Sequence, residues 1–308
     1  MCWNIEQILS LILCPSFNWI SKPEKSKPRR INISEIYVLT RQKCGNFKKV
    51  KHISEVNKIN PDYILICSRT SDHFKHLSYL EKNISNKIIL VEKPLFKNFK
   101  NFTIKKNKVF IGYNLRYHPV IKFIKKYVNN KKVFSINVNC YSYLPNWRKN
   151  INYAKSNSAK KNYGGGVLLE LSHEIDYVQW IFKKIRKVNH VTIKKISNLK
   201  TDAEDCVSII GKTDFADFII DLNYFSLYLQ RLVIINGNDF TLKGDLIYNS
   251  VEIFKKNKKK VIKFKIDKNY TYNLQHKSLL SNNYKNSCTY IQGIQLMLLI
   301  DKIRKLKN

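Results

Sequence analysis

The chain has 308 residues, of which 44% are hydrophobic, and its formal net charge at pH 7 is +34. This length is enough for two domains of ordinary size, each with a buried core. No apolar run approaches the roughly 20 residues of a membrane-spanning helix, so we expect no membrane anchor. The seven cysteines are scattered, and no close pair indicates a zinc or redox site, so we expect no metal and a reducing, cytoplasmic compartment.

The positive charge is spread over the whole chain, and the lysines often stand beside asparagine. A compositional bias toward Lys and Asn produces this background without a selected binding surface. We therefore expect no specific nucleic-acid partner, since no recognised binding motif accompanies the charge. Attraction to acidic or phosphorylated small substrates is compatible with it.

Residues 34–94 alternate strand-like and helix-like stretches. Apolar β-type runs occupy 36–39, 63–67 and 87–91, a helical stretch covers 73–81, and a short strand follows at 109–112. Continuous apolar strands separated by helices indicate a parallel sheet covered on both faces. This is the doubly wound, Rossmann-like α/β arrangement, in which ligands bind outside the carboxyl ends of the strands.

The pattern changes after residue 112, where long strands with turn signals dominate. They are predicted at 133–143, 188–196, 206–211, 215–225, 232–235 and 240–242, and one helical stretch at 167–182 interrupts them. The pair Asn236-Gly237 is a strong turn signal between two of these strands. The second half is therefore predicted to be an α+β domain with a mostly antiparallel, open sheet and helices on one face.

Several motifs occur in a fixed order along the chain. Glu92-Lys93-Pro94 ends a predicted parallel strand, where a doubly wound sheet presents groups to a ligand. The stretch GYNLRYHP follows at 112–119, GGGVLLELSHEID at 164–176, and RLVIING at 231–237, with Thr241 and Leu242 behind it. Together these stretches resemble the Gfo/Idh/MocA family of oxidoreductases, which includes glucose-fructose oxidoreductase and inositol dehydrogenase. The resemblance covers about residues 34–300.

The resemblance implies an NAD(P)-dependent oxidoreductase that acts on a hydroxyl or keto carbon of a sugar or activated sugar, in surface-carbohydrate biosynthesis. It implies an NAD(P)-binding, Rossmann-like domain at residues 1–115, atypical at 1–33, and a substrate-binding and oligomerisation domain at 116–308. It also implies a homo-oligomer, because open sheets of the second kind commonly pair face to face in this family.

The candidate catalytic residues are Lys93, His173 and Glu170. A sugar dehydrogenase removes a hydroxyl proton as hydride leaves the adjacent carbon, and an imidazole that titrates near neutral pH suits this task. By resemblance, His173 is the acid/base, and Lys93 binds the reacting oxygen and the nicotinamide ribose. Glu170 takes the position of the family's Asp, but it precedes the histidine by three residues instead of four. The alternatives are a structural helix histidine and a surface lysine.

Further ligand contacts are predicted from the same resemblance. The predicted cofactor-binding residues are Thr40, Arg41, Thr70, His73, Glu92, Lys93 and Pro94. The predicted substrate-binding residues are Asn114, Arg116, Trp147, Arg148, Tyr153 and Asp176.

The segment from Trp147 to Ser158 resembles the one that closes over the sugar in the surface-polysaccharide branch of the family. An aromatic ring beside the Arg148 guanidinium suits a hydroxylated, anionic ligand. The alternative is a structural Trp and a solvated Arg. Ala154 stands where that branch often has an Arg, which weakens the case for an acidic substrate.

The start of the chain departs from the family. A dinucleotide site needs a Gly-rich turn between the first strand and helix, because only Gly lets the backbone approach the pyrophosphate. Residues 1–33 contain no glycine, and their Pro-Lys run at 21–28 does not make a buried strand. We therefore expect a Rossmann-like domain that is incomplete at its start. Either an altered reading frame or start site has replaced the first strand, turn and helix, or the segment folds in its own way.

Two function hypotheses follow from this departure. The first is the sugar oxidoreductase with NAD or NADP as cofactor. Thr40 and Arg41 stand where an NAD-selective site would place Asp or Glu, which favours NADP slightly. The second is a catalytically impaired, non-enzymatic relative that binds a sugar or dimerises.

Overall fold

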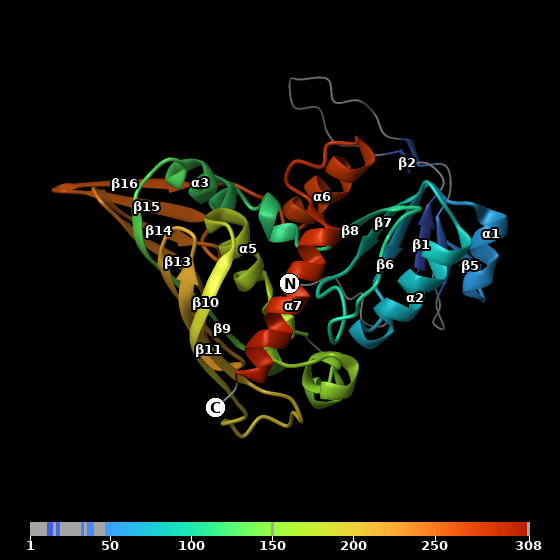
Figure 1. Ribbon diagram of the computed structural model, residues 1–308, viewed down its shortest axis with the longest axis horizontal. Coiled ribbons are helices and arrows are strands. Elements are labelled where there is room, and N and C mark those ends of the chain that lie inside the picture. Colours follow the sequence, from blue (N-terminus) through green and yellow to red (C-terminus); the bar gives the residue numbers. More distant parts are fainter. Residues whose placement is uncertain are drawn as a thin grey trace. The chain divides into compact units, whose positions relative to one another are not determined.

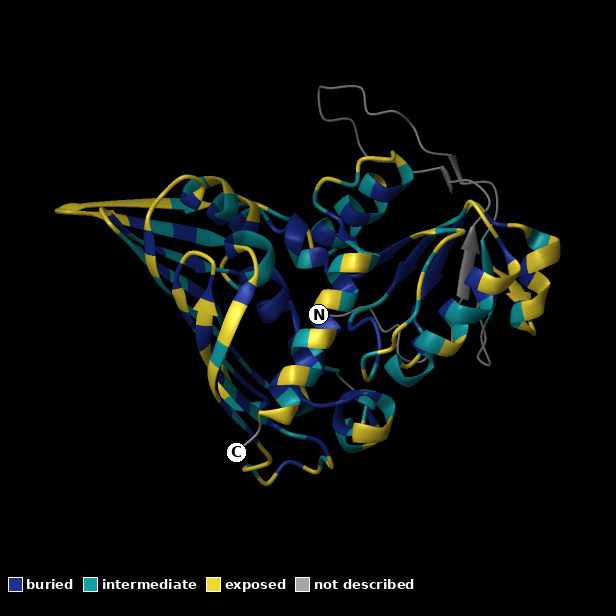
Figure 2. Ribbon diagram, in the orientation of Figure 1, coloured by how far each residue is buried: buried dark blue, intermediate teal, exposed yellow. Residues whose placement is uncertain are grey.

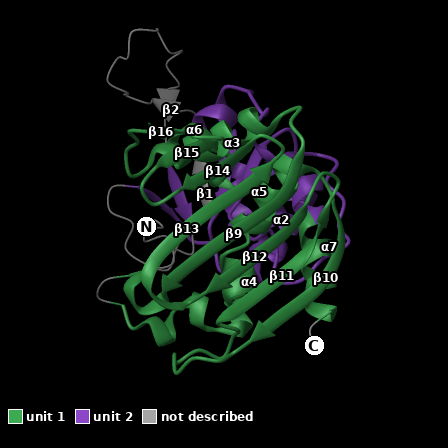
Figure 3. Ribbon diagram, turned by 90° about the vertical axis from the view of Figure 1, so that its left-hand side faces the viewer, with its two compact units in different colours: residues 1, 113–275, 296–308 green, residues 2–112, 276–295 purple. Residues whose placement is uncertain are grey.

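The computed structural model describes residues 11–14, 17–18, 32–33, 36–39, 47–148 and 151–306. The chain divides into two compact units, which Figure 3 shows in green and purple. Unit 1 contains Tyr113–Gln275 and Leu296–Asn308, and unit 2 contains Cys2–Gly112 and His276–Gln295. Each unit contains one large sheet, so the predicted α/β and α+β fold classes are confirmed. The assignment of a cofactor to residues 1–115 and of a substrate to 116–308 stays a prediction.

The sheet of unit 2 has seven strands in the order β17-β8-β7-β6-β1-β4-β5 (Figure 1). Their bounds are β1 Leu11–Cys14, β4 Tyr37–Leu39, β5 Lys48–Val50, β6 Tyr63–Ile66, β7 Ile88–Val91, β8 Lys108–Ile111 and β17 Cys288–Thr289. The pairs β4-β5, β6-β7 and β7-β8 are parallel. All four residues of β6 are buried, as expected for a strand that is covered on both faces.

The direction of β1 departs from a doubly wound sheet. This strand lies between β6 and β4 but runs antiparallel to both. Leu11 pairs with Ile66, the last residue of β6, and Cys14 pairs with Tyr63, the first residue of β6. The last residue of β1 therefore lies at the edge of the sheet where β6 begins, opposite to the edge where ligands of this fold bind. Two further short strands, β2 Phe17–Asn18 and β3 Asn32–Ile33, pair with each other.

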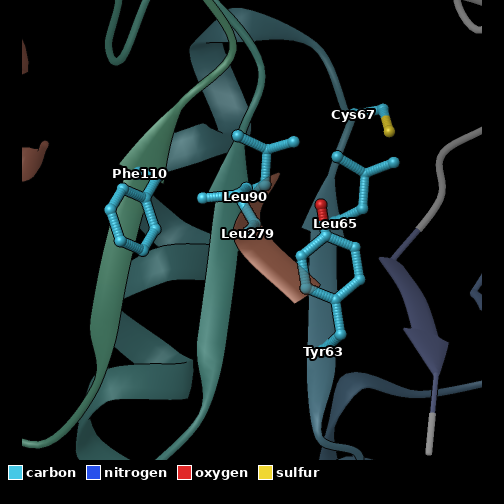
Figure 4. Packing of buried hydrophobic residues seen from close by; sticks show 6 residues of the cluster. All are labelled: Tyr63, Leu65, Cys67, Leu90, Phe110 and Leu279. Atoms are coloured by element: carbon cyan, nitrogen blue, oxygen red, sulfur yellow. The ribbon is translucent and has the colours of Figure 1, made fainter. Parts of the chain in front are cut away.

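Helices and a compact core hold the sheet of unit 2 together. After β5 come the short helices η2 Ile53–Glu55 and α1 Val56–Ile59. The helix α2 spans Thr70–Asn83 and includes the predicted stretch 73–81. Its residues His73, Leu77 and Leu80 are buried, with the spacing of one helical face. Figure 4 shows the core on the sheet, formed by Tyr63, Leu65, Cys67, Leu90, Phe110 and Leu279.

The sheet of unit 1 has eight strands in the order β10-β11-β12-β9-β13-β14-β15-β16. Their bounds are β9 Val133–Tyr143, β10 Ile185–Lys194, β11 Cys206–Thr213, β12 Asp217–Asn223, β13 Phe225–Gly237, β14 Phe240–Asp245, β15 Ser250–Lys255 and β16 Lys258–Lys263. The pair β9-β12 is parallel, and the other pairs are antiparallel. Burial alternates along β9, so one face of the sheet is covered and the other is open (Figure 2).

The remaining helices are η3 Asn114–Tyr117, α3 Pro119–Val128, η4 Leu144–Asn146, η5 Tyr153–Lys155, η6 Asn157–Ala159, η7 Lys161–Tyr163, α4 Val167–Glu170, α5 His173–Phe182, α6 Tyr270–Leu280 and α7 Tyr290–Lys305. None of the helices in the described part of the chain is long and apolar enough to cross a membrane.

Three local predictions in unit 1 are wrong in detail. The single helix over 167–182 is two helices, because Leu171 leaves the helical region with φ −99° and ψ 27°. The strand predicted from Phe215 begins at Asp217, because the hydroxyl of Thr213 accepts hydrogen bonds from the amides of Phe215 and Ala216 and closes a turn there. The turn expected at Asn236-Gly237 lies two residues later, at Asn238 and Asp239, since β13 continues through Gly237.

Candidate functional site

The Glu92-Lys93-Pro94 segment follows directly after β7, at the carboxyl edge of the parallel strands of unit 2. The amide of Glu92 donates to the carbonyl of Ile66, which ties the segment to β6. The peptide bond between Lys93 and Pro94 is cis. A Cβ on Gly112 would lie 3.1 Å from the Glu92 carboxylate, so glycine at that position makes room for this side chain. The sequence motif is therefore held at the edge where it was predicted.

His73 anchors the same segment from α2. Its Nδ1 lies 3.0 Å from the carbonyl oxygen of Pro94 and 3.2 Å from that of Leu95. Its Nε2 lies 3.0 Å from the carbonyl oxygen of Ser68, in the loop after β6. The side chain is 1% exposed, and burial lowers its pKa to about 4 although the three carbonyls act in the opposite sense. The contacts of His73 therefore join two backbone loops.

The other predicted cofactor residues of unit 2 are less informative. Thr70 is the first residue of α2 and is half-buried. Thr40 and Arg41 lie outside the described residues. Next to Thr70, the hydroxyl of Ser68 lies 2.9 Å from Nδ1 of His76, a contact that the sequence did not suggest.

In unit 1, His173 is the first residue of α5 and is 8% exposed. The rings of His173 and Tyr113 meet edge to face, with 5.4 Å between their centroids. The hydroxyls of Tyr113 and Ser172 are 3.1 Å apart. Tyr113 thus fixes the start of α5 through both its ring and its hydroxyl.

Glu170 is the last residue of α4, and Leu171 and Ser172 separate it from α5, so Glu170 and His173 do not belong to one continuous helix. The hydroxyl of Ser158 donates a hydrogen bond of 3.1 Å to Oε1 of Glu170. Gly166, which precedes α4, has φ +110°, and a Cβ there would lie 2.3 Å from Oε1 of Glu204. That oxygen accepts a hydrogen bond from the amide of Leu168 at 3.2 Å. The glycine therefore admits the carboxylate that caps α4.

Arg116 and Asp176, two predicted substrate-binding residues, bind each other. Nε of Arg116 donates to one carboxylate oxygen of Asp176 at 2.9 Å, and Nη2 donates to the other at 2.7 Å. Both side chains are buried, and burial raises the pKa of Asp176 while the guanidinium opposes that rise. The guanidinium also lies 5.3 Å from the ring centre of Trp180. This bidentate pair joins η3 to α5.

A second buried pair, which the sequence did not reveal, fixes α5 from the other side. Arg231 on β13 donates to both carboxylate oxygens of Glu174, at 2.6 and 3.0 Å. The predicted residue Asn114 is also buried and engaged, since its amide donates to the hydroxyl of Thr271 at 2.9 Å. The helix that carries His173 is thus held by two charged pairs.

Trp147, Arg148 and Tyr153 lie around one small cavity of about 10 Å³. Leu144, Ile151, Ser156 and Ser158 complete its lining. The predicted residues are therefore brought together, but the cavity has room for about one water molecule and not for a sugar ring.

Two buried polar groups near this cavity were not predicted from the sequence. The hydroxyls of Ser156 and Tyr224 are buried and have no hydrogen-bond partner among the described residues. Trp147 packs edge to face on Tyr224, with centroids 5.0 Å apart, and burial raises the pKa of Tyr224. No sequence signal marks either residue, because Tyr224 joins two strands and Ser156 lies between short helices.

The described residues lack the usual cradle for the pyrophosphate of a nicotinamide dinucleotide. The cradle for that group is a Gly-rich turn at the carboxyl end of a central parallel strand. The central strand β1 is antiparallel, and its last residue, Cys14, lies at the opposite edge of the sheet. The first glycine of the sequence is Gly45, far behind β1. The described residues also contain no cluster of His, Cys, Asp or Glu that could hold a metal ion.

Neither a protein-family model nor a curated protein matches this chain, but solved structures do. Levoglucosan dehydrogenase, in complex with NADH and levoglucosan, is similar with a TM-score of 0.74 and 14% identity over 85% of this chain and 83% of that one. The WlbA dehydrogenase from Bordetella pertussis, in complex with NADH and UDP-GlcNAcA, has a TM-score of 0.65 and 15% identity over 85% and 81%. A super-repressor mutant of Gal80p from Saccharomyces cerevisiae has a TM-score of 0.68 and 12% identity over 84% and 82%. At these identities the similarity establishes the fold, which this chain shares with nicotinamide-dependent oxidoreductases.

Proposed function

We propose that this protein is an NAD(P)-dependent oxidoreductase that acts on a hydroxyl or keto carbon of a sugar or activated sugar, in surface-carbohydrate biosynthesis. The observation that carries the proposal is Lys93, which follows a buried parallel strand at the ligand-binding edge of a doubly wound sheet. Two structures of the same fold, levoglucosan dehydrogenase and WlbA, were solved with NADH and a sugar-type ligand. The cytoplasm is the proposed compartment, in line with the seven scattered cysteines, none of which forms a close pair in the sequence.

The proposal gives each catalytic candidate its own task. Lys93 donates a hydrogen bond to the reacting oxygen and stabilises the charge that develops on it. His173 accepts the proton of the reacting hydroxyl when the sugar is oxidised, and returns it when a keto group is reduced. Glu170 accepts from Ser158 and thereby links α4 to the segment that holds Trp147 and Tyr153. We assign this segment and Arg148 to sugar recognition by resemblance, which requires the small cavity among them to open.

The buried residues have supporting tasks in the same proposal. His73 and Glu92 hold Lys93 in place through the backbone, with Pro94 as the anchored residue. Arg116 and Asp176 neutralise each other and fix α5, so they position His173 without contacting the sugar. The preference for NADP over NAD rests on Thr40 and Arg41 and stays a prediction.

The experiment that tests the proposal is a turnover assay with a panel of sugars and nucleotide sugars, read by nicotinamide absorbance. We expect turnover with at least one sugar and none for Lys93→Ala or His173→Ala, because each variant loses the group that handles the reacting oxygen or its proton. Turnover that survives in both variants would refute the assignment of the two residues.

The second candidate is a relative without catalysis that binds a sugar or dimerises. One observation favours it: β1 is antiparallel, and the described residues lack the pyrophosphate cradle. A Gal80p super-repressor with the same fold is among the similar structures. This candidate shares the proposed homo-oligomer, in which two open sheet faces pair, but it predicts no nicotinamide binding and no turnover.

A further inference from the structure

Unit 2 contains a groove of about 820 Å³ that none of the described candidate residues lines. Among the described residues, its lining comes from the end of β4, the stretch that follows β5, α2, and the stretch that precedes β8. The groove therefore lies over the helical layer of unit 2 and is separate from the segment with Lys93.

The groove is strongly basic. Its lining includes Lys51, Lys75, Lys82, Lys105 and Lys106. Within the described part of the chain, none of these five ammonium groups has a carboxylate oxygen within 4.0 Å. Nζ of Lys106 donates to the carbonyl of Lys82 at 3.0 Å. Ammonium groups that share a concave surface and lack a carboxylate partner reinforce one another's field and raise the local concentration of anions.

The one carboxylate in the lining is already engaged by the protein. Oε1 of Glu81 accepts from the amides of Lys105 and Lys106, each at 2.6 Å, and Oε2 accepts from the side chain of Asn107 at 2.8 Å. Glu81 is 6% exposed, so these hydrogen bonds hold its charge within the protein. The charged groups of the groove that face solvent are therefore the lysine side chains.

The groove is also elongated, and one of its walls is apolar. Lys75, Tyr79 and Lys82 recur on one side of α2, and seven residues of helix span about 10 Å. Leu39, Ile53 and Phe102 line the groove together with the Tyr79 ring, and all four are half-buried. A flat ring can pack on such a wall while phosphate groups meet the lysines.

We propose that this groove is a binding site for a nucleoside diphosphate, with the base on the apolar wall and the phosphates at the lysines. The lysines at its far end, Lys105 and Lys106, precede the amino end of β8. The groove therefore extends from the carboxyl ends of β4 and β5, where Leu39 and Lys51 lie, to the amino end of β8, and the proposal does not depend on the sugar chemistry.

The test is calorimetric titration of the full chain with ADP and with inorganic pyrophosphate. The variant Lys75→Glu/Lys105→Glu changes two exposed lysines of the groove, and Lys122→Glu/Lys126→Glu makes the same charge change on the exposed side of α3 in unit 1. We expect saturable ADP binding that weakens at least tenfold in the groove variant and less than twofold in the α3 variant. Pyrophosphate is expected to bind at least tenfold more weakly than ADP.

Two results would overturn the proposal. The first is absent ADP binding, or equal weakening in both variants, which would show only the attraction of a basic chain for anions. The second is equal affinity for pyrophosphate and ADP, which would remove the role of the apolar wall. Lys93→Ala, which tests the proposed function, is expected to bind ADP like the unchanged protein, so the two proposals fail separately.

Discussion

The imidazole of His73 bridges two loops, because Nδ1 lies 3.0 Å from the carbonyl of Pro94 and Nε2 lies 3.0 Å from the carbonyl of Ser68. This arrangement fixes the loop with Lys93 from a helix that starts at the neighbouring strand. We predict that His73→Leu lowers the free energy of unfolding by about 1–3 kcal/mol, because a buried carbonyl loses the single N–H donor of the neutral imidazole. It should also reduce kcat more than it raises KM. Urea unfolding and steady-state kinetics measure both, with the exposed His190→Leu as control. Equal effects of the two substitutions would contradict a bridging role.

Because three histidines are buried, we predict that the folded protein loses stability in mild acid. Burial lowers the pKa of His73, His118 and His276 to about 4, below the ordinary value of 6.5. The unfolded chain therefore binds more protons than the folded one between about pH 6.5 and pH 4. This stability is fully present above pH 6.5 and is lost as the pH falls toward 4, by up to about 3 kcal/mol per histidine. The free energy of unfolding, measured with urea at pH 7, 6 and 5, should fall as the pH falls. A free energy that stays constant over this range would contradict the prediction.

The pair of Arg116 and Asp176 predicts strong coupling in a double-mutant cycle. Removing one partner leaves a buried charge uncompensated, so Arg116→Met or Asp176→Leu alone should cost about 3–5 kcal/mol. The double variant should cost clearly less than the sum of the two, because it leaves no unpaired charge. Denaturant unfolding of the four proteins measures the coupling. Additive costs would show that the two side chains act independently.

The backbone conformation of Gly166 predicts that any other residue at this position destabilises the protein. Its φ of +110° is unfavourable for other residues, and a Cβ would collide with the Glu204 carboxylate at 2.3 Å. Gly166→Ala should therefore lower the free energy of unfolding by about 2 kcal/mol or more. Combining it with Glu204→Ala, which removes the obstacle, should recover part of that loss. If the second substitution recovers nothing, the collision is not the cause.

The sequence predicted the parts of the fold that depend on local patterns. The apolar runs of β6, β7 and β8 mark buried strands, and each strand lies within one residue of its predicted bounds. The direction of β1 could not be predicted, because Leu11–Cys14 is an apolar run that fits either orientation. Only the pairing with β6 decides it.

The candidate site also has parts that the sequence could predict and parts that it could not. The position of Lys93 follows from a strand end, which is a local signal. The partners of Arg116 and Glu174 could not be predicted, because they lie 60 and 57 residues away along the chain. The split between α4 and α5 occurs where the backbone of Leu171 leaves the helical region, and because a leucine does not signal a helix end, the sequence predicted one helix over 167–182.

The measurement that tests the central claim most directly is a titration of the full chain with NADH and with NADPH, followed by nicotinamide fluorescence. The proposed oxidoreductase predicts saturable binding of at least one of the two, displaced by its oxidised form. Absence of saturable binding for both would contradict the claim. It would leave a relative that keeps the fold but not the cofactor, as the reversed β1 strand favours.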